Sequence, residues 1–239
     1  MAQNAGIRRF FLAGLQRRFG QLTPNLVANA YWDDLPPGFQ PGGNEMTWLQ
    51  DPIDVALTLH PVFEGLGIAY YLSGGIAAIF YGEYRTTQDA DLVLNLDAEQ
   101  LPALVTTLEN LGFYVAGVDD AVGGRLATLQ AIHTETLAKA DLTLSGGDEF
   151  EIAKFARRRL ETLEQRGQLY LITPEDLVLS KLRWRQRSQS EKQWRDILGI
   201  LKVQSTMLDL DYLQEWAVQL KLAPDLAKVL AAAGIQSNG

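Results

Sequence analysis

Two aspartates spaced two residues apart are the residues of this sequence best suited to chemistry on phosphate groups. Asp89 and Asp91 begin an apolar segment predicted to be a buried strand over 91–96, and their spacing projects both side chains from the same face. Neighbouring carboxylates repel each other unless a cation lies between them or protons neutralise them. The alternative interpretation is a solvated acidic pair at the entry to a strand.

A third carboxylate, Asp141, lies in the segment 137–144, which is also predicted to be a strand. Alternation in this segment places Asp141 on one polar face with Lys139 and Thr143. Aspartates on neighbouring strands are the components of a two-metal site, in which cations about 3.5 to 4 Å apart hold the attacking and leaving oxygens. Asp148 competes for the third position, but it follows Ser-Gly-Gly and is typical of a loop or a helix N-cap.

The turn Ser73-Gly74-Gly75 separates a predicted strand over 68–72 from a predicted helix over 76–81. Adjacent glycines let the backbone pass close to a bound group, and a helix start offers free N–H donors to an anion such as a triphosphate. A glycine pair between a strand and a helix is by itself a weak indication of phosphate binding. Together with the aspartates it predicts a phosphate-binding turn.

The composition restricts a metal in this protein to one held by oxygen ligands. The 239 residues contain no Cys and two His, which excludes disulfides, thiolate chemistry and zinc sites of the Cys or His-rich types. Oxygen ligands favour hard cations such as Mg²⁺. No apolar run approaches the roughly 18 to 20 residues that span a bilayer, and the start of the chain lacks the features of a secretory signal. We therefore expect a cytoplasmic protein that does not associate with membranes.

Charge is distributed unevenly along the chain. The net charge of −8 argues against a general attraction to nucleic acid or acidic lipid. Residues 154–202 nevertheless hold 12 Lys and Arg against 6 Asp and Glu, a local balance of +6. Basic side chains interleaved with Trp184 and Trp194 could contact an RNA backbone and stack on a base. The alternative is a solvated basic face with both tryptophans in the core.

Apolar periodicity predicts an α+β fold: a small mixed β-sheet flanked by helices, followed by a C-terminal helical region. Thr173 and Pro174 are typical of an N-cap and a first helical position, so a helix is expected to begin there. Leu177, Leu201 and Leu213 are expected to be core residues. The helix at Pro174 is expected to cover 174–187, and another helix is expected to start at Asp51-Pro52 and end near Gly65 and Gly67. The other expected helices cover 98–111, 190–204, 209–220 and 224–233, and further strands cover 126–132 and 168–172.

The chain is predicted to have three parts. Residues 1–45 contain a short basic segment and a Pro/Gly-rich segment, and are predicted to be an N-terminal extension that is disordered or not native, with Met46 as an alternative start. Residues 46–172 form the predicted catalytic core. Residues 173–239 form the C-terminal helical region.

Thirteen residues separate Gly74-Gly75 from Asp89-Ala-Asp91, and Arg85 lies just before the aspartates. This arrangement resembles the signature of the polymerase-beta-like nucleotidyltransferase superfamily. Within it, the sequence is most similar to the bacterial stand-alone nucleotidyltransferases of the type IV toxin (abortive-infection) group and their uncharacterised relatives. The similarity extends over about residues 46–235. Many members carry Ser directly after the double glycine, whereas this chain has Ile76 there and Ser73 before it.

The resemblance implies a reaction in which an acceptor hydroxyl attacks the α-phosphorus of an NTP and pyrophosphate leaves. Asp89 and Asp91 would ligate both Mg²⁺ ions, and Asp141 would ligate the catalytic one and help to deprotonate the acceptor. The NTP would be bound by Arg85, Lys181 and the turn Ser73-Gly74-Gly75.

Two of the NTP ligands have structural alternatives, and two further polar residues are predicted to be structural. Arg85 has a second interpretation as the partner of a neighbouring acid, and Lys181 as a solvated lysine on a helix. Asp196 is predicted to be structural, holding Lys181 or Arg195 in place. His133 is predicted to be a hydrogen-bonded turn residue and not a catalytic base.

The leading hypothesis for function is a Mg²⁺-dependent nucleotidyltransferase that moves a nucleoside monophosphate from an NTP to an acceptor hydroxyl. The 3′ end of an RNA, a protein hydroxyl and a small molecule all fit as acceptors, and the base of the NTP is open. The alternative from another class is a non-catalytic protein of the same fold that binds a nucleotide or a partner, in a toxin-antitoxin-like pair. In either case an antitoxin is a candidate partner.

Overall fold

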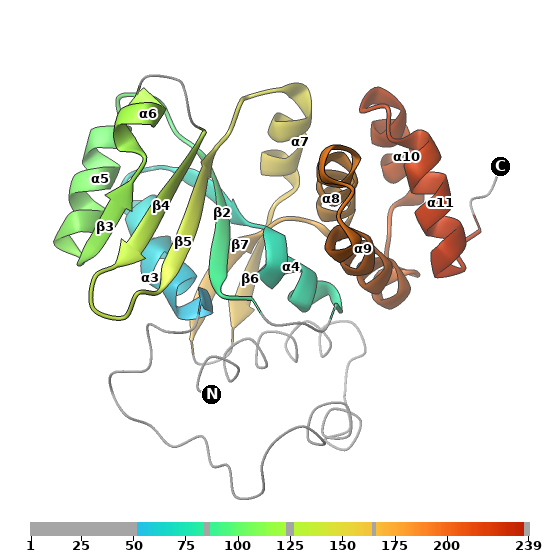
Figure 1. The fold of residues 1–239 in the computed structure, drawn as a ribbon, viewed down its shortest axis with the longest axis horizontal. Helices are drawn as coiled ribbons and strands as arrows, with labels where there is room; N and C mark the ends of the chain where they lie inside the picture. Colours follow the sequence, from blue (N-terminus) through green and yellow to red (C-terminus); the bar gives the residue numbers. More distant parts are fainter. Residues whose placement is uncertain (1–51, 84–86, 123–126, 164–165, 237–239) are drawn as a thin grey trace, which may run out of the picture.

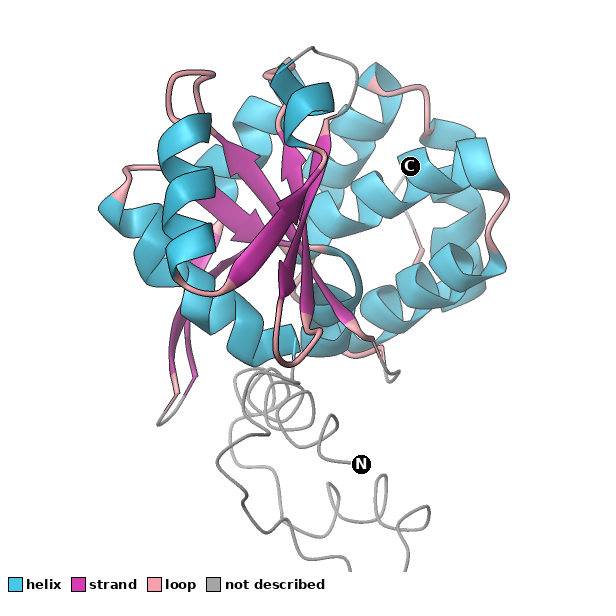
Figure 2. Cartoon of the chain, turned by 60° about the vertical axis from the view of Figure 1, so that its left-hand side comes forward, coloured by secondary structure: helices cyan, strands magenta, loops and turns pink. Residues whose placement is uncertain are grey.

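The structure, a computed structural model, describes residues 52–83, 87–122, 127–163 and 166–236. The predicted extension 1–45, the alternative start Met46 and the predicted NTP ligand Arg85 lie outside the described residues. A mixed sheet with helices on both sides forms the core, and a group of helices from the C-terminal part of the chain packs beside it (Figures 1 and 2). This architecture confirms the predicted α+β fold.

The described strands form one seven-stranded sheet in the order β3-β4-β5-β2-β1-β7-β6. β2 runs parallel to β5, and β1 runs parallel to β7, whereas the other neighbours are antiparallel. The central position of β2, next to β5, brings segments far apart in the sequence side by side (Figure 1). The strands are β1 (Ala69–Leu72), β2 (Asp89–Asn95), β3 (Phe113–Ala116), β4 (Thr128–His133), β5 (Lys139–Leu144), β6 (Arg159–Leu163) and β7 (Gly167–Leu171).

The helices divide into those that cover the sheet and those that pack on one another. α3 packs on β1, β2, β5 and β7, and α5 packs on β3. The C-terminal helices α8 to α11 form a layer that meets the sheet region through α4. The described helices are α3 (Pro52–Gly65), α4 (Gly74–Tyr81), α5 (Leu101–Asn110), α6 (Val118–Val122), α7 (Glu149–Arg157), α8 (Pro174–Ser188), α9 (Glu191–Gln204), α10 (Leu210–Gln219) and α11 (Ala223–Ala233).

Alternation along β2 separates the hydrophobic core from the candidate site. Ala90, Leu92 and Leu94 are fully buried, whereas Asp91 and Val93 on the other face are only half-buried. This is the burial that period-two alternation predicts for a strand with one polar face. Predicted core residues Leu177, Leu201 and Leu213 are also buried.

Helix starts follow the sequence signals. Thr173 is the N-cap of α8, where its side chain accepts a hydrogen bond from the N–H of Asp176, and Pro174 is in the first turn. Asp148 is likewise the N-cap of α7 and accepts from the N–H of Glu151. The assignment of Asp148 to a helix start and not to the carboxylate cluster is therefore confirmed.

A buried polar network joins α7 to the C-terminal helices. Tyr212 donates a 2.6 Å hydrogen bond to Asp176 Oδ1, and the Arg157 guanidinium lies 3.7 Å from the centroid of the Tyr212 ring. Arg157 also lies 3.2 Å from Glu175 Oε2. Burial raises the pKa of Asp176, while hydrogen bonds from Tyr212 and Thr173 oppose that rise. The network holds α7, α8 and α10 together.

Some elements differ from the sequence prediction. The sequence did not predict β3, α6, α7 or β6. One alternative for Trp184 was a place in the core, but Trp184 is 61% exposed. Within the described ranges, no helix is long and apolar enough to span a bilayer.

Candidate active site

Asp91 and Asp141 occupy directly paired positions on the parallel strands β2 and β5. The same register pairs Asp89 with Lys139, so the third predicted carboxylate lies two residues further back on the same face, beside a lysine. All three aspartates are half-buried. The structure thus brings the predicted carboxylates onto one face of two adjacent strands.

The glycine turn is built against Asp91. Gly75 donates its N–H to Asp91 Oδ2 at 3.1 Å, and Ser73 donates its N–H to the Asp91 carbonyl at 2.8 Å. Gly74 has φ of +59°, and a Cβ on it would lie 1.8 Å from Asp91 Oδ2. Only glycine fits this position, because both the left-handed backbone and the close carboxylate exclude a side chain.

This contact changes the role expected of the turn. In the structure, the Gly75 N–H already holds a carboxylate, so it orients Asp91 instead of pointing to solvent. Ser73 is the N-cap of α4, and its hydroxyl makes no capping hydrogen bond. The Ser73 side chain lines a cavity next to the aspartates. Contact of this turn with an NTP remains a prediction.

Asp141 is oriented by a residue that the sequence analysis did not single out. Gln130 on β4 pairs with Asp141 across the antiparallel ladder and donates its Nε2–H to Asp141 Oδ1 at 3.0 Å. The only signal in the sequence was a polar residue within a predicted apolar strand. Gln130 thus binds Oδ1 of Asp141 and does not hydrogen-bond to the second carboxylate oxygen.

The donor set fits Mg²⁺ in part. Among the described residues, no group of three or more His, Cys, Asp or Glu side chains is arranged to hold a metal ion. Asp91 and Asp141 nevertheless supply hard oxygen donors from paired positions, and a hydrogen bond from a neighbouring element holds each of them. Mg²⁺ is commonly bound by one or two carboxylates together with substrate phosphates and water, without a complete protein cage. Two carboxylates are therefore enough for a site of this kind, and metal binding by Asp89, Asp91 and Asp141 stays a prediction.

A cavity of about 360 Å³ is lined by residues that neighbour the aspartates along their strands, although the aspartates themselves do not line it. It is lined by Val93 and Thr143, the paired residues that follow Asp91 and Asp141 on the same face of β2 and β5. Two residues along a strand correspond to roughly 7 Å. A ligand group held at the aspartates therefore has room to extend into this cavity.

One wall of the cavity comes from α7. Tyr71 donates a 3.1 Å hydrogen bond to Glu151 Oε2, and Lys154 forms an ion pair with the other oxygen of Glu151. Tyr71 and Lys154 are buried, and all three residues line the cavity. Burial and the neighbouring Glu151 raise the pKa of Tyr71, so its hydroxyl keeps its proton at neutral pH.

The opposite wall is one face of α8, and Lys181 is not on it. Ser180, Arg183, Trp184 and Arg187 line the cavity, whereas Lys181 points elsewhere into the helical layer. Lys181 Nζ lies 2.7 Å from Asp196 Oδ2 and 3.1 Å from Gln193 Oε1. The prediction that Asp196 holds Lys181 is confirmed.

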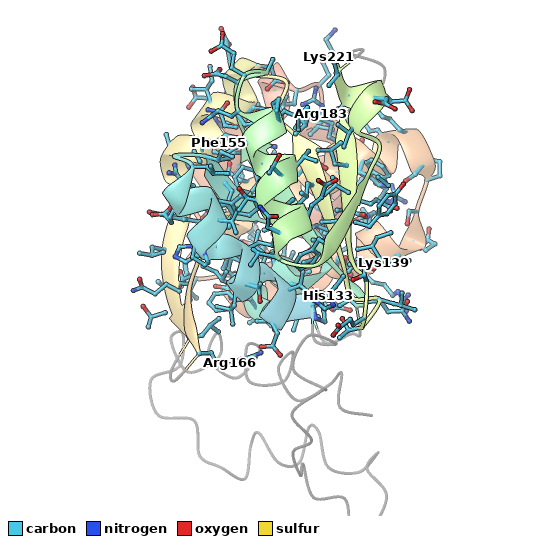
Figure 3. All side chains as sticks on the ribbon, turned by 90° about the vertical axis from the view of Figure 1, so that its left-hand side faces the viewer. His133, Lys139, Phe155, Arg166, Arg183 and Lys221 are labelled. Atoms are coloured by element: carbon cyan, nitrogen blue, oxygen red, sulfur yellow. The ribbon has the colours of Figure 1, made fainter. Side chains whose placement is uncertain are left out.

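Arginines of α8 face different surroundings. Arg183 lies 3.4 Å from Asp148 Oδ2, toward the end of the molecule opposite Lys139 (Figure 3). Arg185 instead lies 4.6 Å from the centroid of the Trp194 ring. The basic segment is therefore not one continuous face.

His133 has the structural role that the sequence predicted. It lies at the end of β4, where its Nδ1 is 3.3 Å from the Thr136 N–H and its ring packs edge-on against Phe113. Figure 3 shows it at the end of the molecule away from Arg183.

Three solved structures are similar to this chain, and the first of them supports the fold described above. An antigenic nucleotidyltransferase-like protein from Paracoccidioides brasiliensis is 20% identical, with a TM-score of 0.50 over 80% of this chain and 95% of that chain. The lincomycin-bound lincosamide antibiotic adenylyltransferase LnuA is 13% identical, with a TM-score of 0.39 over 61% of this chain and 94% of that one. The antibiotic-resistance factor ANT(2″)-Ia is 13% identical, with a TM-score of 0.44 over 75% of this chain and 94% of that one.

The last two TM-scores are below 0.5, so these two structures do not establish the fold of this chain. No protein-family model matches the sequence, and no curated protein matches it significantly. The chain therefore has a nucleotidyltransferase-like fold, with paired aspartates beside a glycine turn.

Proposed function

We propose that this protein is a Mg²⁺-dependent nucleotidyltransferase that transfers a nucleoside monophosphate from an NTP to an acceptor hydroxyl. The observation that carries the proposal is the pairing of Asp91 with Asp141 beside the turn that holds Asp91. The nucleotidyltransferase-like fold supports it. When bound, Mg²⁺ would neutralise charge on the phosphates and lower the cost of the developing negative charge.

Asp91 and Asp141 have different roles in the proposed reaction. Asp91, held by the Gly75 N–H, would be a metal ligand, and Asp141, held by Gln130, would be a second ligand and would accept the proton of the acceptor hydroxyl. The acceptor oxygen forms a bond to the α-phosphorus, and the bond from that phosphorus to the bridging oxygen breaks. Pyrophosphate leaves with the electron pair.

The acceptor is an RNA 3′ end, a protein hydroxyl or a small molecule. A place in the type IV toxin group, with a partner antitoxin, is the finer proposal that the sequence motifs support. Expression of the wild type and of Asp91→Asn in a bacterial host tests it. The proposal expects growth arrest by the wild type alone, and normal growth with both forms would contradict it.

The test of activity is incubation of the purified chain with each labelled NTP and Mg²⁺, alone, with total RNA and with cell lysate. The expected result is label on one acceptor class with release of pyrophosphate, lost on chelation of Mg²⁺. Binding of an NTP without transfer under every condition would contradict the enzyme and favour the non-catalytic alternative.

A further inference from the structure

One face of α8 turns four polar or aromatic side chains into the cavity. Ser180, Arg183, Trp184 and Arg187 are spaced three, four and seven residues from the first, which places them on one side of a helix. The Ser180 hydroxyl oxygen has no hydrogen-bond partner among the described residues. The Ser180 hydroxyl on this face is therefore not satisfied by contacts with the described residues.

Trp184 is the most unusual member of the face. Its side chain is 61% exposed, and the structure records no ring or cation contact for it within the described ranges. Two other tryptophans are engaged: Trp194 lies against Arg185, and Trp216 packs 5.1 Å from Phe150, measured between ring centroids. A large, exposed indole that lines a cavity is suited to stacking on a flat ligand.

Arg187 is open in the same way. Of the cations that line the cavity, Lys154 is paired with Glu151 and Arg183 with Asp148. Arg187 is exposed and has no ion pair within the described part of the chain. Its guanidinium, one helical turn beyond Trp184, is available to an anionic group.

We infer that this cavity binds the donor nucleotide, with its base stacked on Trp184 and a phosphate paired with Arg187. The inference rests on the proposed function and names the residues that would recognise the donor. A cavity of 360 Å³ is within the range for small ligands, roughly 300 to 1,000 Å³. It starts directly beyond the paired aspartates, so a nucleotide held there by a phosphate places its remaining parts in the cavity.

The experiment compares binding of ATP, GTP, CTP and UTP with binding of inorganic tripolyphosphate, by titration calorimetry in Mg²⁺. Trp184→Ala should weaken the tightest NTP about tenfold or more and leave tripolyphosphate unchanged, because only the base is lost as a partner. Trp184→Phe should restore most of the affinity. Arg187→Gln should weaken both the NTP and tripolyphosphate.

Two matched controls separate the cavity from general surface effects. Tyr114→Ala removes another aromatic side chain with the same 61% exposure, on the edge strand β3. Arg195→Gln removes an exposed arginine on α9 outside the cavity lining. Both variants should bind NTP and tripolyphosphate like the wild type, and melting temperatures confirm that every variant is folded.

Three results would overturn the inference. Undiminished NTP affinity in Trp184→Ala, with wild-type nucleotidyl transfer, would reject the base-binding role and leave the proposed function intact. Loss of affinity for an RNA oligonucleotide but not for NTPs would assign this wall to an acceptor instead. A wild type that neither binds nor transfers any NTP would reject the proposed function as well.

Discussion

Asp91 is linked to the glycine turn by its side chain and its main chain, while Asp141, its register partner on β5, is linked to β4. The two carboxylates are therefore held from opposite sides, one by Gly75 and one by Gln130. Like charges at paired positions repel each other, and this repulsion is the basis of the first prediction.

Asp91→Asn and Asp141→Asn should each abolish nucleotidyl transfer without destabilising the fold. Removing one of two crowded charges should leave the melting temperature unchanged or raise it. Transfer should fall at least about 100-fold, since loss of a metal ligand removes several kcal/mol of transition-state stabilisation and each 1.36 kcal/mol is about tenfold in rate. Thermal melting with and without Mg²⁺ and NTP, beside a labelled-NTP assay, measures both effects.

Asp97→Asn is the matched control, because Asp97 is an exposed carboxylate just beyond the end of β2. It should resemble the wild type in both assays. If Mg²⁺ and NTP do not change the wild-type melting temperature, and both site variants transfer nucleotide normally, the metal site is not there.

Gly74→Ala should damage the site from the backbone side. The left-handed conformation at φ of +59° costs a residue with a Cβ about 1 to 2 kcal/mol, and that Cβ would overlap Asp91 Oδ2. Asp91 must move, so transfer should fall about 100-fold, the loss that a 1 Å misplacement of a catalytic group can cause. Gly65→Ala is the control, since a Cβ there meets nothing within 4 Å. Equal transfer by the two variants would show that the turn does not position Asp91.

Alternation within strands made much of this site predictable from the sequence. It placed Asp91 and Asp141 on polar faces before their register was known. It did not reveal Gln130, because the contact depends on the antiparallel register of β4 with β5. Local patterns fix the face of a residue, whereas its partner on another strand depends on the whole sheet.

Helix α7 and the cavity wall were less accessible to sequence reasoning. The buried aromatic residues of α7, Phe150 and Phe155, are five residues apart, so the usual spacing of three or four is missing. The orientation of α8 could not be predicted from the sequence either. Ser180 lines the cavity and the adjacent Lys181 contacts α9, and this difference depends on how α9 packs against α8.

Asp148 should stabilise the fold in a pH-dependent way. Burial alone would raise its pKa, but the Glu151 N–H and Arg183 outweigh it and hold the pKa below its usual value of 3.8. A lowered folded-state pKa means that this stabilisation is present above pH 3.8 and is lost as pH falls through the folded-state value.

Urea unfolding at neutral and acidic pH checks this prediction with two variants. Asp148→Ala should cost about 1 kcal/mol at neutral pH, because α7 loses its N-cap. Asp148→Asn keeps the capping oxygen but not the charge, so the wild type should exceed it in stability at neutral pH, and the difference should shrink in acid. A difference that is constant with pH would contradict the role of the charge.

Lys181 and Asp196 form an ion pair whose side chains are 6% and 2% exposed, so its disruption should be costly. Lys181→Met or Asp196→Leu alone should lower the free energy of unfolding by about 3 to 5 kcal/mol, because each removes one half of a buried ion pair. The double variant should recover most of that loss. The resemblance gives Lys181 a contact with the triphosphate, whereas its absence from the cavity lining favours an anchor between α8 and α9. ATP affinity of the folded double variant separates the two roles: we expect wild-type affinity, and a loss that persists after stability has recovered would assign Lys181 to the nucleotide.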